Sequence, residues 1–262
     1  MLNVFINLLK TSKTQLGGFL TLIFITAIIN NPSMQAFFVF VLSIISTVFF
    51  DILFLRLRKI KLLFPSAALV TGCIIGLLTS PLAGWHVPVA IAALAMFSKN
   101  FMRFSNRHVF NPGAFGLLTG TLIFSTAVSW WAVSWQQFFP QSGISLRETI
   151  PFLILLSPTI VSMVKMKRYR ITLSFLITYA LLTQFLNLNS SILNLIPDPT
   201  TLFFAIVMLP EPLTSPNNHK RQIIFGAFVG FLALTISLWN FMTIDPFIAA
   251  LLTGNAVFFK LR

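Results

Sequence analysis

The 262-residue sequence has little charge and very few acidic side chains: charged residues make up 9% of it, and only 5 residues are Asp or Glu. Soluble proteins carry roughly 25% charged residues, so this chain cannot cover a globular surface with groups that water solvates. Hydrophobic residues instead reach 56%, and 30 residues are Phe. These values exclude an ordinary soluble domain and indicate that lipid surrounds most of the protein.

Cysteine and histidine are scarce as well. Cys73 is the single cysteine, which excludes an internal disulfide and a cysteine-ligated iron–sulfur cluster held by this chain alone. His86, His108 and His219 lie at or near the ends of apolar stretches without a partner at matched depth, so paired ligation of a haem is not expected. No Gly-rich phosphate loop, Ser/His/Asp set or zinc-ligand spacing occurs.

What the sequence does contain is a series of ten apolar stretches with no room for a soluble domain between them. They cover residues 16–29, 35–55, 66–80, 85–97, 112–130, 150–164, 171–186, 200–209, 223–238 and 246–259. Several are shorter than the ~20 residues of a straight spanning helix, which predicts broken or half-crossing helices that neighbouring protein covers. We therefore expect an all-α membrane protein of about ten transmembrane helices in a single domain, residues 1–262.

The positions of the basic residues test this count of spans. The formal net charge is +13. If ten spans are threaded with the N-terminus in the cytoplasm, every Lys and Arg except Arg147 falls on the cytoplasmic side. A missed span would move all later clusters to the other side. The sequence therefore predicts a multi-pass protein of the inner (cytoplasmic) cell membrane with both termini cytoplasmic, and the positive charge gives no reason to expect nucleic-acid binding.

An internal repeat divides the chain in two. Asn-Pro-Gly-Ala-Phe-Gly-Leu-Leu-Thr-Gly at 111–120 shares its proline and its Leu-Leu-Thr-Gly block with Asp-Pro-Phe-Ile-Ala-Ala-Leu-Leu-Thr-Gly at 245–254, and Pro65 pairs more weakly with Pro197. Each half, 1–130 and 148–262, holds five spans, and an odd number makes the second copy inverted. Such repeats place binding sites near the midplane, at the repeat interface. The alternative, that Leu-Leu-Thr-Gly is common in membrane helices, stays open.

Five polar residues are expected to line a site at that interface: Asn111, Thr119, Glu211, Thr214 and Asp245. Asn111 and Asp245 each precede a proline at the start of a span, so simple helix capping is an equally good explanation for both. Glu211 lies between two prolines, and Thr214 follows shortly after it. A helix broken in this way exposes carbonyl groups and hydroxyls to a polar ligand, although a plain cytoplasmic turn is the alternative.

Two further expectations concern residues outside this site. Asp51 is expected to form an interfacial ion pair near Arg56, or to contact a partner subunit. Trp130, Trp131 and Trp135 cluster at the predicted outer boundary and are typical of an aromatic belt.

Several motifs in order resemble those of the NqrB/RnfD family. These are Ser-Ala-Ala-Leu-Val-Thr-Gly at 66–72, Thr-Ser-Pro-Leu-Ala at 79–83, Phe-Asn-Pro-Gly-Ala-Phe-Gly at 110–116, Met-Leu-Pro-Glu-Pro-Leu-Thr-Ser-Pro at 208–216, Arg-Gln-Ile-Ile-Phe-Gly at 221–226 and the closing segment 246–255. The resemblance runs from about Pro65 to the C-terminus. Family members are the NqrB component of the sodium-translocating NADH:quinone reductase and the RnfD component of the Rnf complex.

The resemblance implies a fold of two inverted five-helix repeats, similar to urea transporters. It also implies a membrane subunit that holds a flavin and passes electrons, with other membrane, flavin and iron–sulfur subunits as partners. Family members carry FMN on the threonine of a Ser-Gly-Ala-Thr motif between the fifth and sixth spans. The segment 131–148 has no such motif, and its nearest string, Ser-Gly-Ile-Ser at 142–145, lacks the threonine. Covalent FMN is therefore not expected, and noncovalent riboflavin or FMN is.

Three hypotheses follow. In the first, the chain is a membrane subunit of an Nqr/Rnf-like redox complex that holds or contacts a flavin in a step coupled to Na⁺ or H⁺ movement. In the second, the same scaffold is a non-redox transporter or channel for an ion or small polar solute. In the third, it is an assembly subunit whose polar residues only stabilise broken helices.

Overall fold

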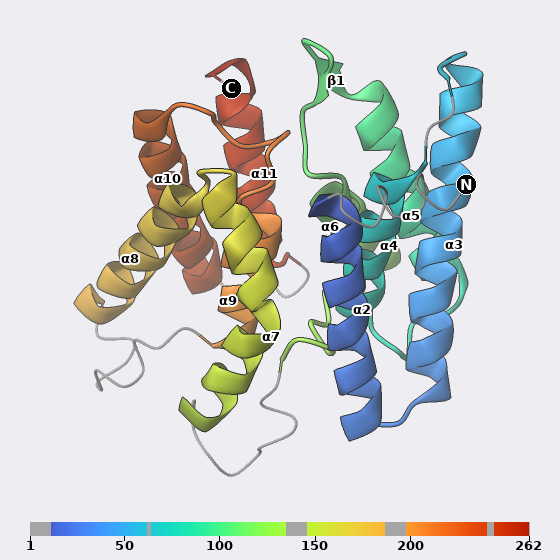
Figure 1. Ribbon diagram of the computed structural model, residues 1–262, viewed down its shortest axis with the longest axis horizontal. Coiled ribbons are helices and arrows are strands. Elements are labelled where there is room, and N and C mark those ends of the chain that lie inside the picture. Colours follow the sequence, from blue (N-terminus) through green and yellow to red (C-terminus); the bar gives the residue numbers. More distant parts are fainter. Residues whose placement is uncertain (1–11, 62–63, 135–145, 187–197, 240–243, 262) are drawn as a thin grey trace.

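The computed structural model describes residues 12–61, 64–134, 146–186, 198–239 and 244–261, and these are helical almost throughout (Figure 1). The first half contains α2 (Ser12–Asn30), α3 (Met34–Leu57), α4 (Ser66–Leu78), α5 (His86–Phe101), a hairpin of β1 (Arg103–Phe104) and β2 (Arg107–His108), and α6 (Pro112–Phe124). The second half contains α7 (Leu146–Lys165), α8 (Tyr169–Phe185), α9 (Pro199–Phe203) with the π-helix η3 (Phe204–Met208), α10 (His219–Trp239), and α11 (Pro246–Phe258) with the 3₁₀-helix η4 (Phe259–Leu261). Each predicted apolar stretch corresponds to a helical segment of the described chain.

Three of these helices begin in the same way. Asp198, Asn111 and Asp245 each precede a proline, and each side chain accepts a hydrogen bond from the backbone N–H three residues later. The proline at the first helical position needs no hydrogen-bond acceptor and already has a helical φ angle. Capping is therefore a property of Asn111 and Asp245 in this fold.

The fifth predicted apolar stretch, residues 112–130, extends beyond the helix that it predicts, because α6 covers only Pro112–Phe124. α6 ends at Phe124 because Ser125 takes a left-handed conformation with φ of 51°. Residues 125–134 then fold inward, where Ser129 N–H bonds the Leu78 carbonyl at the end of α4. Trp130 and Trp131 are consequently buried, at 7% and 5% exposure. The expectation of an aromatic belt is wrong for these two residues, and Trp135 lies outside the described residues.

By length and composition, two helices of the described chain, α3 and α10, are able to cross a membrane by themselves. α3 also exposes large apolar side chains, including Phe38, Ile45 and Phe49. α4, α6 and α11 have only 13 residues each, or a length of ~20 Å. Helices this short do not reach across a ~30 Å hydrocarbon core. Their length therefore agrees with the expectation of half-crossing helices.

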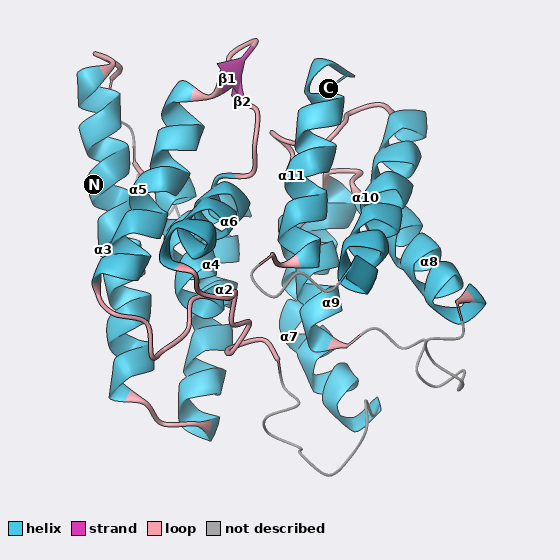
Figure 2. Cartoon of the chain, turned by 180° about the vertical axis from the view of Figure 1, so that it is seen from behind, coloured by secondary structure: helices cyan, strands magenta, loops and turns pink. Residues whose placement is uncertain are grey.

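The two halves lie side by side and repeat the same packing (Figures 1 and 2). In the first half α3 packs on α5 and α5 on α6, and in the second α8 packs on α10 and α10 on α11. The repeat glycines Gly120 and Gly254 also correspond, because a Cβ at either would press on the preceding long helix, at Ile91 of α5 and at Val229 of α10. Contacts between the halves join α2 to α7 and α6 to α11. This pattern agrees with a duplication, and the inverted relation of the halves stays a prediction.

Most segments that carry the basic clusters lie at one edge of the molecule. Figure 1 shows the end of α3, the β1–β2 hairpin, the start of α10 and the end of α11 at its upper edge, with the α7–α8 connection below them in the upper half. The arrangement fits the threading that the charges predict. Which side of a membrane this edge faces stays a prediction.

Candidate functional site

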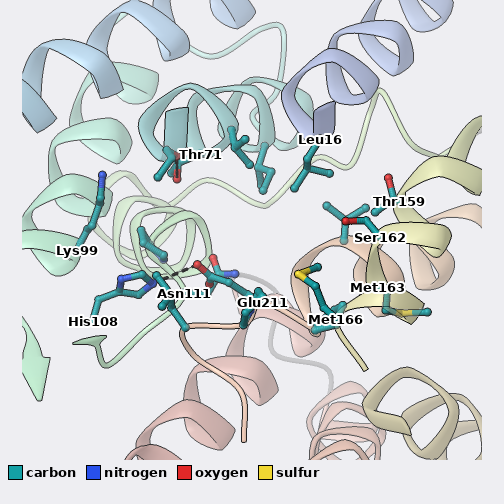
Figure 3. A pocket seen from close by; sticks show the side chains of 18 of the residues that line it. Leu16, Thr71, Lys99, His108, Asn111, Thr159, Ser162, Met163, Met166 and Glu211 are labelled. Atoms are coloured by element: carbon teal, nitrogen blue, oxygen red, sulfur yellow. Dashed lines mark hydrogen bonds and ion pairs between the residues drawn. The ribbon is translucent and has the colours of Figure 1, made fainter. Parts of the chain in front are cut away.

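A cavity of about 530 Å³ lies between the two halves. Its walls come from α2, α4, the α5–hairpin–α6 region, α7, η3 and the turn after η3. Figure 3 shows polar side chains of the first half, Thr71, Lys99, His108 and Asn111, on one side, and Thr159 and Ser162 of the second half across from them. Glu211, also of the second half, lies beside Asn111 and His108. The volume falls within the range of roughly 300–1,000 Å³ that small-molecule and cofactor sites occupy.

The π-helix η3 leads directly into the turn that carries Glu211. Leu209 N–H bonds the Phe204 carbonyl five residues back, and Pro210 and Pro212 then prevent a regular helix from continuing. The Thr172 hydroxyl on α8 donates to the Ala205 carbonyl at 2.7 Å and so satisfies an acceptor within the π-helical turn. A broken helix at the cavity is therefore present, as the Pro-Glu-Pro motif predicted.

Glu211 connects the two halves through its carboxylate. Its Oε1 atom is 3.1 Å from His108 Nε2, which belongs to the hairpin before α6. Its Oε2 atom accepts a hydrogen bond from the Thr214 hydroxyl at 3.0 Å. His108 is almost fully buried, whereas the Glu211 side chain is 25% exposed. Both oxygens of the carboxylate are thus oriented by the protein.

Asn111 and Asn255 form a second connection. The Asn255 side chain accepts from Asn111 N–H at 2.8 Å and donates to the Thr214 carbonyl at 3.2 Å. The Asn111 side chain caps α6 and also donates to the Met208 carbonyl at the end of η3, at 3.3 Å. Asn255 was not among the predicted site residues, although it directly follows the second Leu-Leu-Thr-Gly block.

Arg168, at the start of α8, holds the far end of the Glu211 turn. Its guanidinium donates to the Ser215 carbonyl and hydroxyl at 3.1 Å each, and also to the Pro216 carbonyl and the Asn217 side chain. Burial lowers its pKa, and the neighbouring Arg107 lowers it further. No pattern in the sequence signals this role, because Arg168 stands in a basic run with Lys167 and Arg170 that resembles any cytoplasmic loop.

The five predicted site residues divide by position. Asn111 and Glu211 line the cavity, and Thr214 is fully buried behind Glu211. The Thr119 hydroxyl bonds the Phe115 carbonyl of its own helix at 2.6 Å and is not part of the cavity wall. Asp245 accepts a hydrogen bond from Trp130 Nε1 at 2.6 Å and also lies away from the cavity. A cofactor contact stays a prediction for all five.

Asp51 has a different partner from the one expected. Its side chain is bound by Lys99 Nζ at 2.8 Å and by Asn100 Nδ2 at 3.1 Å. Both donors come from α5, which packs along α3. The expected proximity to Arg56 was based on distance along the chain, whereas packing between helices decides the pair. Lys99 also lines the cavity, so Asp51 fixes part of its wall.

The fold and the cavity define a class: a helical protein rich in short helices, whose polar residues meet between two similarly packed halves. Sequence comparison specifies it further. Residues 9–259 match the NQR2, RnfD, RnfE family, and the chain belongs to this family of membrane proteins.

A curated relative from Methanosarcina acetivorans is a subunit, designated D, of the ion-translocating oxidoreductase complex. It is 30% identical over 112 residues, which are 43% of this chain and 38% of the relative. The similarity thus spans well under half of each protein, although the family match covers nearly the whole chain. Family membership confirms the resemblance that the motifs indicated.

Proposed function

We propose that this chain is a membrane subunit of an ion-translocating oxidoreductase complex, and that the cavity between its halves holds a flavin noncovalently. The flavin would pass electrons between other subunits in a step coupled to Na⁺ or H⁺ movement. The name of the relative from Methanosarcina acetivorans supports the first part. The observation that carries the second is the cavity itself, which is large enough for a flavin and lined by both apolar and polar side chains.

The lining suits an isoalloxazine ring with its polar edge. Apolar side chains from both halves, including Leu16, Ile74 and Met163, supply surfaces for the ring. Thr159 Oγ1 lines the cavity, is buried, and has no hydrogen-bond partner in the described part of the chain. Buried polar atoms are normally paired, so this hydroxyl is suited to bond a carbonyl or ring nitrogen of a ligand.

The residues around the cavity would have different roles in flavin binding. The Thr159 and Ser162 hydroxyls would bind the ring, and the His108–Glu211 pair would place a donor and an acceptor beside it. Asn111 would act by keeping η3 against α6, since its amide already bonds Met208. The flavin itself would supply the electron-transfer chemistry, while the protein orients it and excludes water.

The sequence between the fifth and sixth helices supports noncovalent binding. That segment has no Ser-Gly-Ala-Thr string and hence no threonine acceptor in the family's pattern. The partners would be other membrane subunits together with flavin and iron–sulfur subunits, because the single cysteine of this chain cannot hold an iron–sulfur cluster.

An absorbance spectrum of the detergent-purified protein, alone and in its complex, tests this function. We expect flavin bands near stoichiometry that are released by denaturation without proteolysis. Ser162→Phe, which fills the cavity, should remove most of the flavin. Ile177→Phe is the matched control, because Ile177 on α8 is 56% exposed on the outer surface. Flavin-free protein in both preparations would refute the proposal.

A non-redox transporter or channel is the second candidate, favoured by the missing covalent flavin site and by a broken helix at the repeat interface. Uptake of an ion or solute into proteoliposomes without any electron donor would support it. The redox function predicts no such flux.

A further inference from the structure

The cavity lies at one end of the interface between the two halves, and a segment of chain fills the other end. Lys99 and the β1–β2 hairpin border the cavity on the side of the basic edge. Residues 125–134, which follow α6, do not line it. Figures 1 and 2 both show this segment between α2 and α7, away from the hairpin.

The short helix α4 connects the cavity with this segment. Its Thr71 and Ile74 side chains line the cavity, whereas its Gly76 and Leu78 carbonyls accept hydrogen bonds from the segment 125–134. Four residues of an α-helix span ~6 Å. The segment therefore lies about one helical turn beyond the cavity.

The second half meets the cavity and the segment in the reverse order. Val207 near the end of η3 lines the cavity, and Phe203, just before η3, contacts Trp130 with 6.4 Å between the ring centroids. In the same way, Asn111 at the start of α6 is bonded to Asn255 near the end of α11. Corresponding helices thus pass the cavity in opposite directions, which agrees with the predicted inversion of the halves.

Trp131 attaches the segment to the first half. Its Nε1 atom donates to the Gly76 carbonyl at 3.1 Å, and its ring lies edge-on to the ring of Phe24. Ser129 N–H adds a bond to the Leu78 carbonyl. Because the segment is also continuous with α6, it should move together with the first half.

Trp130 attaches the segment to the second half. Its Nε1 atom donates to Asp245 Oδ2 at 2.6 Å, and its ring lies edge-on to the rings of Phe203 and Phe247. All of these contacts are made by side chains. They can separate while every helix stays intact.

The backbone of Trp130 is strained. Its φ angle is 51°, in the left-handed region that bulky residues rarely adopt. Such conformations persist where the surroundings hold them, and they cluster at functional and switch regions. Here the bond to Asp245 and the ring contacts hold the strained form, so separation from the second half would release the strain.

Asp245 corresponds to Asn111 in the internal repeat, since each precedes a proline and caps the helix that follows. Asn111 lines the cavity, whereas Trp130 covers Asp245. In transporters built from inverted repeats, movement of one repeat against the other opens the two ends of a path in turn. By this comparison, the end at Asp245 is the one that is closed here.

We propose that Trp130 is a gate, whose bond to Asp245 closes the interface opposite the basic edge and whose release connects the cavity with the predicted outer side for the coupling cation. This inference rests on the proposed function, because it takes the ion to move between the halves. The released Asp245 carboxyl group would offer the cation a negatively charged ligand. Trp131 would keep the segment attached to the first half meanwhile.

The accessibility of a thiol inside the cavity tests the gate. Thr71→Cys in the full-length protein places a thiol on the cavity wall, and protein without the added cysteine gives the blank. Membrane vesicles come from riboflavin-starved cells, so that no bound flavin shields the thiol. The probe is a small, membrane-impermeant cationic methanethiosulfonate, applied to right-side-out and to inside-out vesicles.

The thiol should react slowly from the outer side while Trp130 is present. Trp130→Ala should raise this rate at least about tenfold, because a minor open state is normally populated at about 10% or less. Trp130→Phe, which keeps a ring but lacks the donor to Asp245, should give a smaller increase. The rate from the inner side should be the same in all variants, which also shows that they are folded.

Trp85→Ala is the matched control, because Trp85 at the start of α5 is 66% exposed. It should leave the outer rate unchanged. An equal increase with Trp85→Ala and Trp130→Ala would indicate general loosening and overturn the gate.

Three further outcomes would also overturn it: an unchanged outer rate in Trp130→Ala, rapid outer labelling while Trp130 is present, and a thiol that reacts from neither side. None of these measurements depends on flavin. The absorbance of protein from riboflavin-fed cells tests the flavin function separately, so either proposal can fail without the other.

Discussion

Asp51 and Lys99 form an ion pair in which the Asp51 side chain is 2% and the Lys99 side chain 17% exposed. Removing one member of a buried pair leaves the other charge without compensation, whereas replacing both by apolar groups is often tolerated. At the scale of single residues, the stability of the first half should therefore depend on the pair being complete.

We expect Asp51→Leu to lower the free energy of unfolding by about 3 kcal/mol. The double variant Asp51→Leu, Lys99→Met should recover most of that loss. Thermal unfolding in detergent measures both, with the exposed Lys59→Gln as control. A double variant no more stable than the single one would show that the pair does not account for the loss.

The contribution of Asn255 to stability can be tested in the same way. Its side chain bonds the buried Asn111 N–H of the first half and the buried Thr214 carbonyl of the second. Asn255→Leu should cost about 2 kcal/mol, because both groups lose their partner. It should also weaken flavin binding, because Asn111 borders the cavity.

Thr253→Val is the matched control on the same helix. The Thr253 hydroxyl bonds only the Ala249 carbonyl of α11 and is exposed, so its loss should cost less than about 0.5 kcal/mol. Equal effects of the two substitutions would show that the hydrogen bonds of Asn255 to both halves do not contribute to stability.

Sequence reasoning reached part of this polar network. Asn111 and Glu211 could be found because a proline beside each marks a broken or starting helix. Asn255 and Arg168 could not, since their partners lie far away along the chain, from 41 residues for the Thr214 carbonyl to 144 for the Asn111 N–H, and most of these partners are backbone groups. Only the packing of the two halves brings these groups within hydrogen-bond distance.

At the scale of elements, close contact between α8 and α10 depends on Gly226. A Cβ at this position would overlap the Ile171 carbonyl oxygen and the Ser174 hydroxyl. Small residues of this kind allow membrane helices to approach.

Gly226→Ala should therefore destabilise the second half by about 1–3 kcal/mol, as measured by thermal unfolding. Gly18→Ala on α2 is the control, because nothing lies within 4 Å of the added methyl group. It should be neutral or slightly stabilising, since alanine favours helix. A neutral Gly226→Ala would mean that α8 and α10 can separate without loss.

The elements were predictable to different degrees. Hydropathy located every helical segment that the structure describes, and the prolines after Asn111 and Asp245 located two helix starts. The end of α6 was missed because residues 125–134 remain apolar although the backbone turns at Ser125. An apolar segment that folds into the protein and one that continues a helix have the same composition.

At the scale of the whole molecule, the basic segments at one edge predict a common side of the membrane. Cys73 is 4% exposed and should not react with a bulky maleimide, so single added cysteines can be labelled without background. Asn31, between α2 and α3, and His219, at the start of α10, are both exposed.

A membrane-impermeant maleimide should label Asn31→Cys in right-side-out vesicles and His219→Cys in inside-out vesicles. Labelling of both from the same side would overturn the predicted topology and the inverted arrangement of the halves with it. Detergent-solubilised protein should be labelled at both positions, which shows that each cysteine is reactive.

The orientation of Glu211 depends on the number of residues in the π-helix η3. Its hydrogen bonds span one residue more than those of an α-helix, so a single deletion within 204–208 would let the ordinary α-helical register resume and leave the following residues in nearly the same orientation. A deletion of two residues there would exceed what the π-helical turn can absorb, and everything after it would turn by about 100° around the helix axis. The carboxylate would then swing away from its histidine with no change in the chemistry of any remaining side chain. In this chain, the length of one short segment is therefore constrained to within one residue.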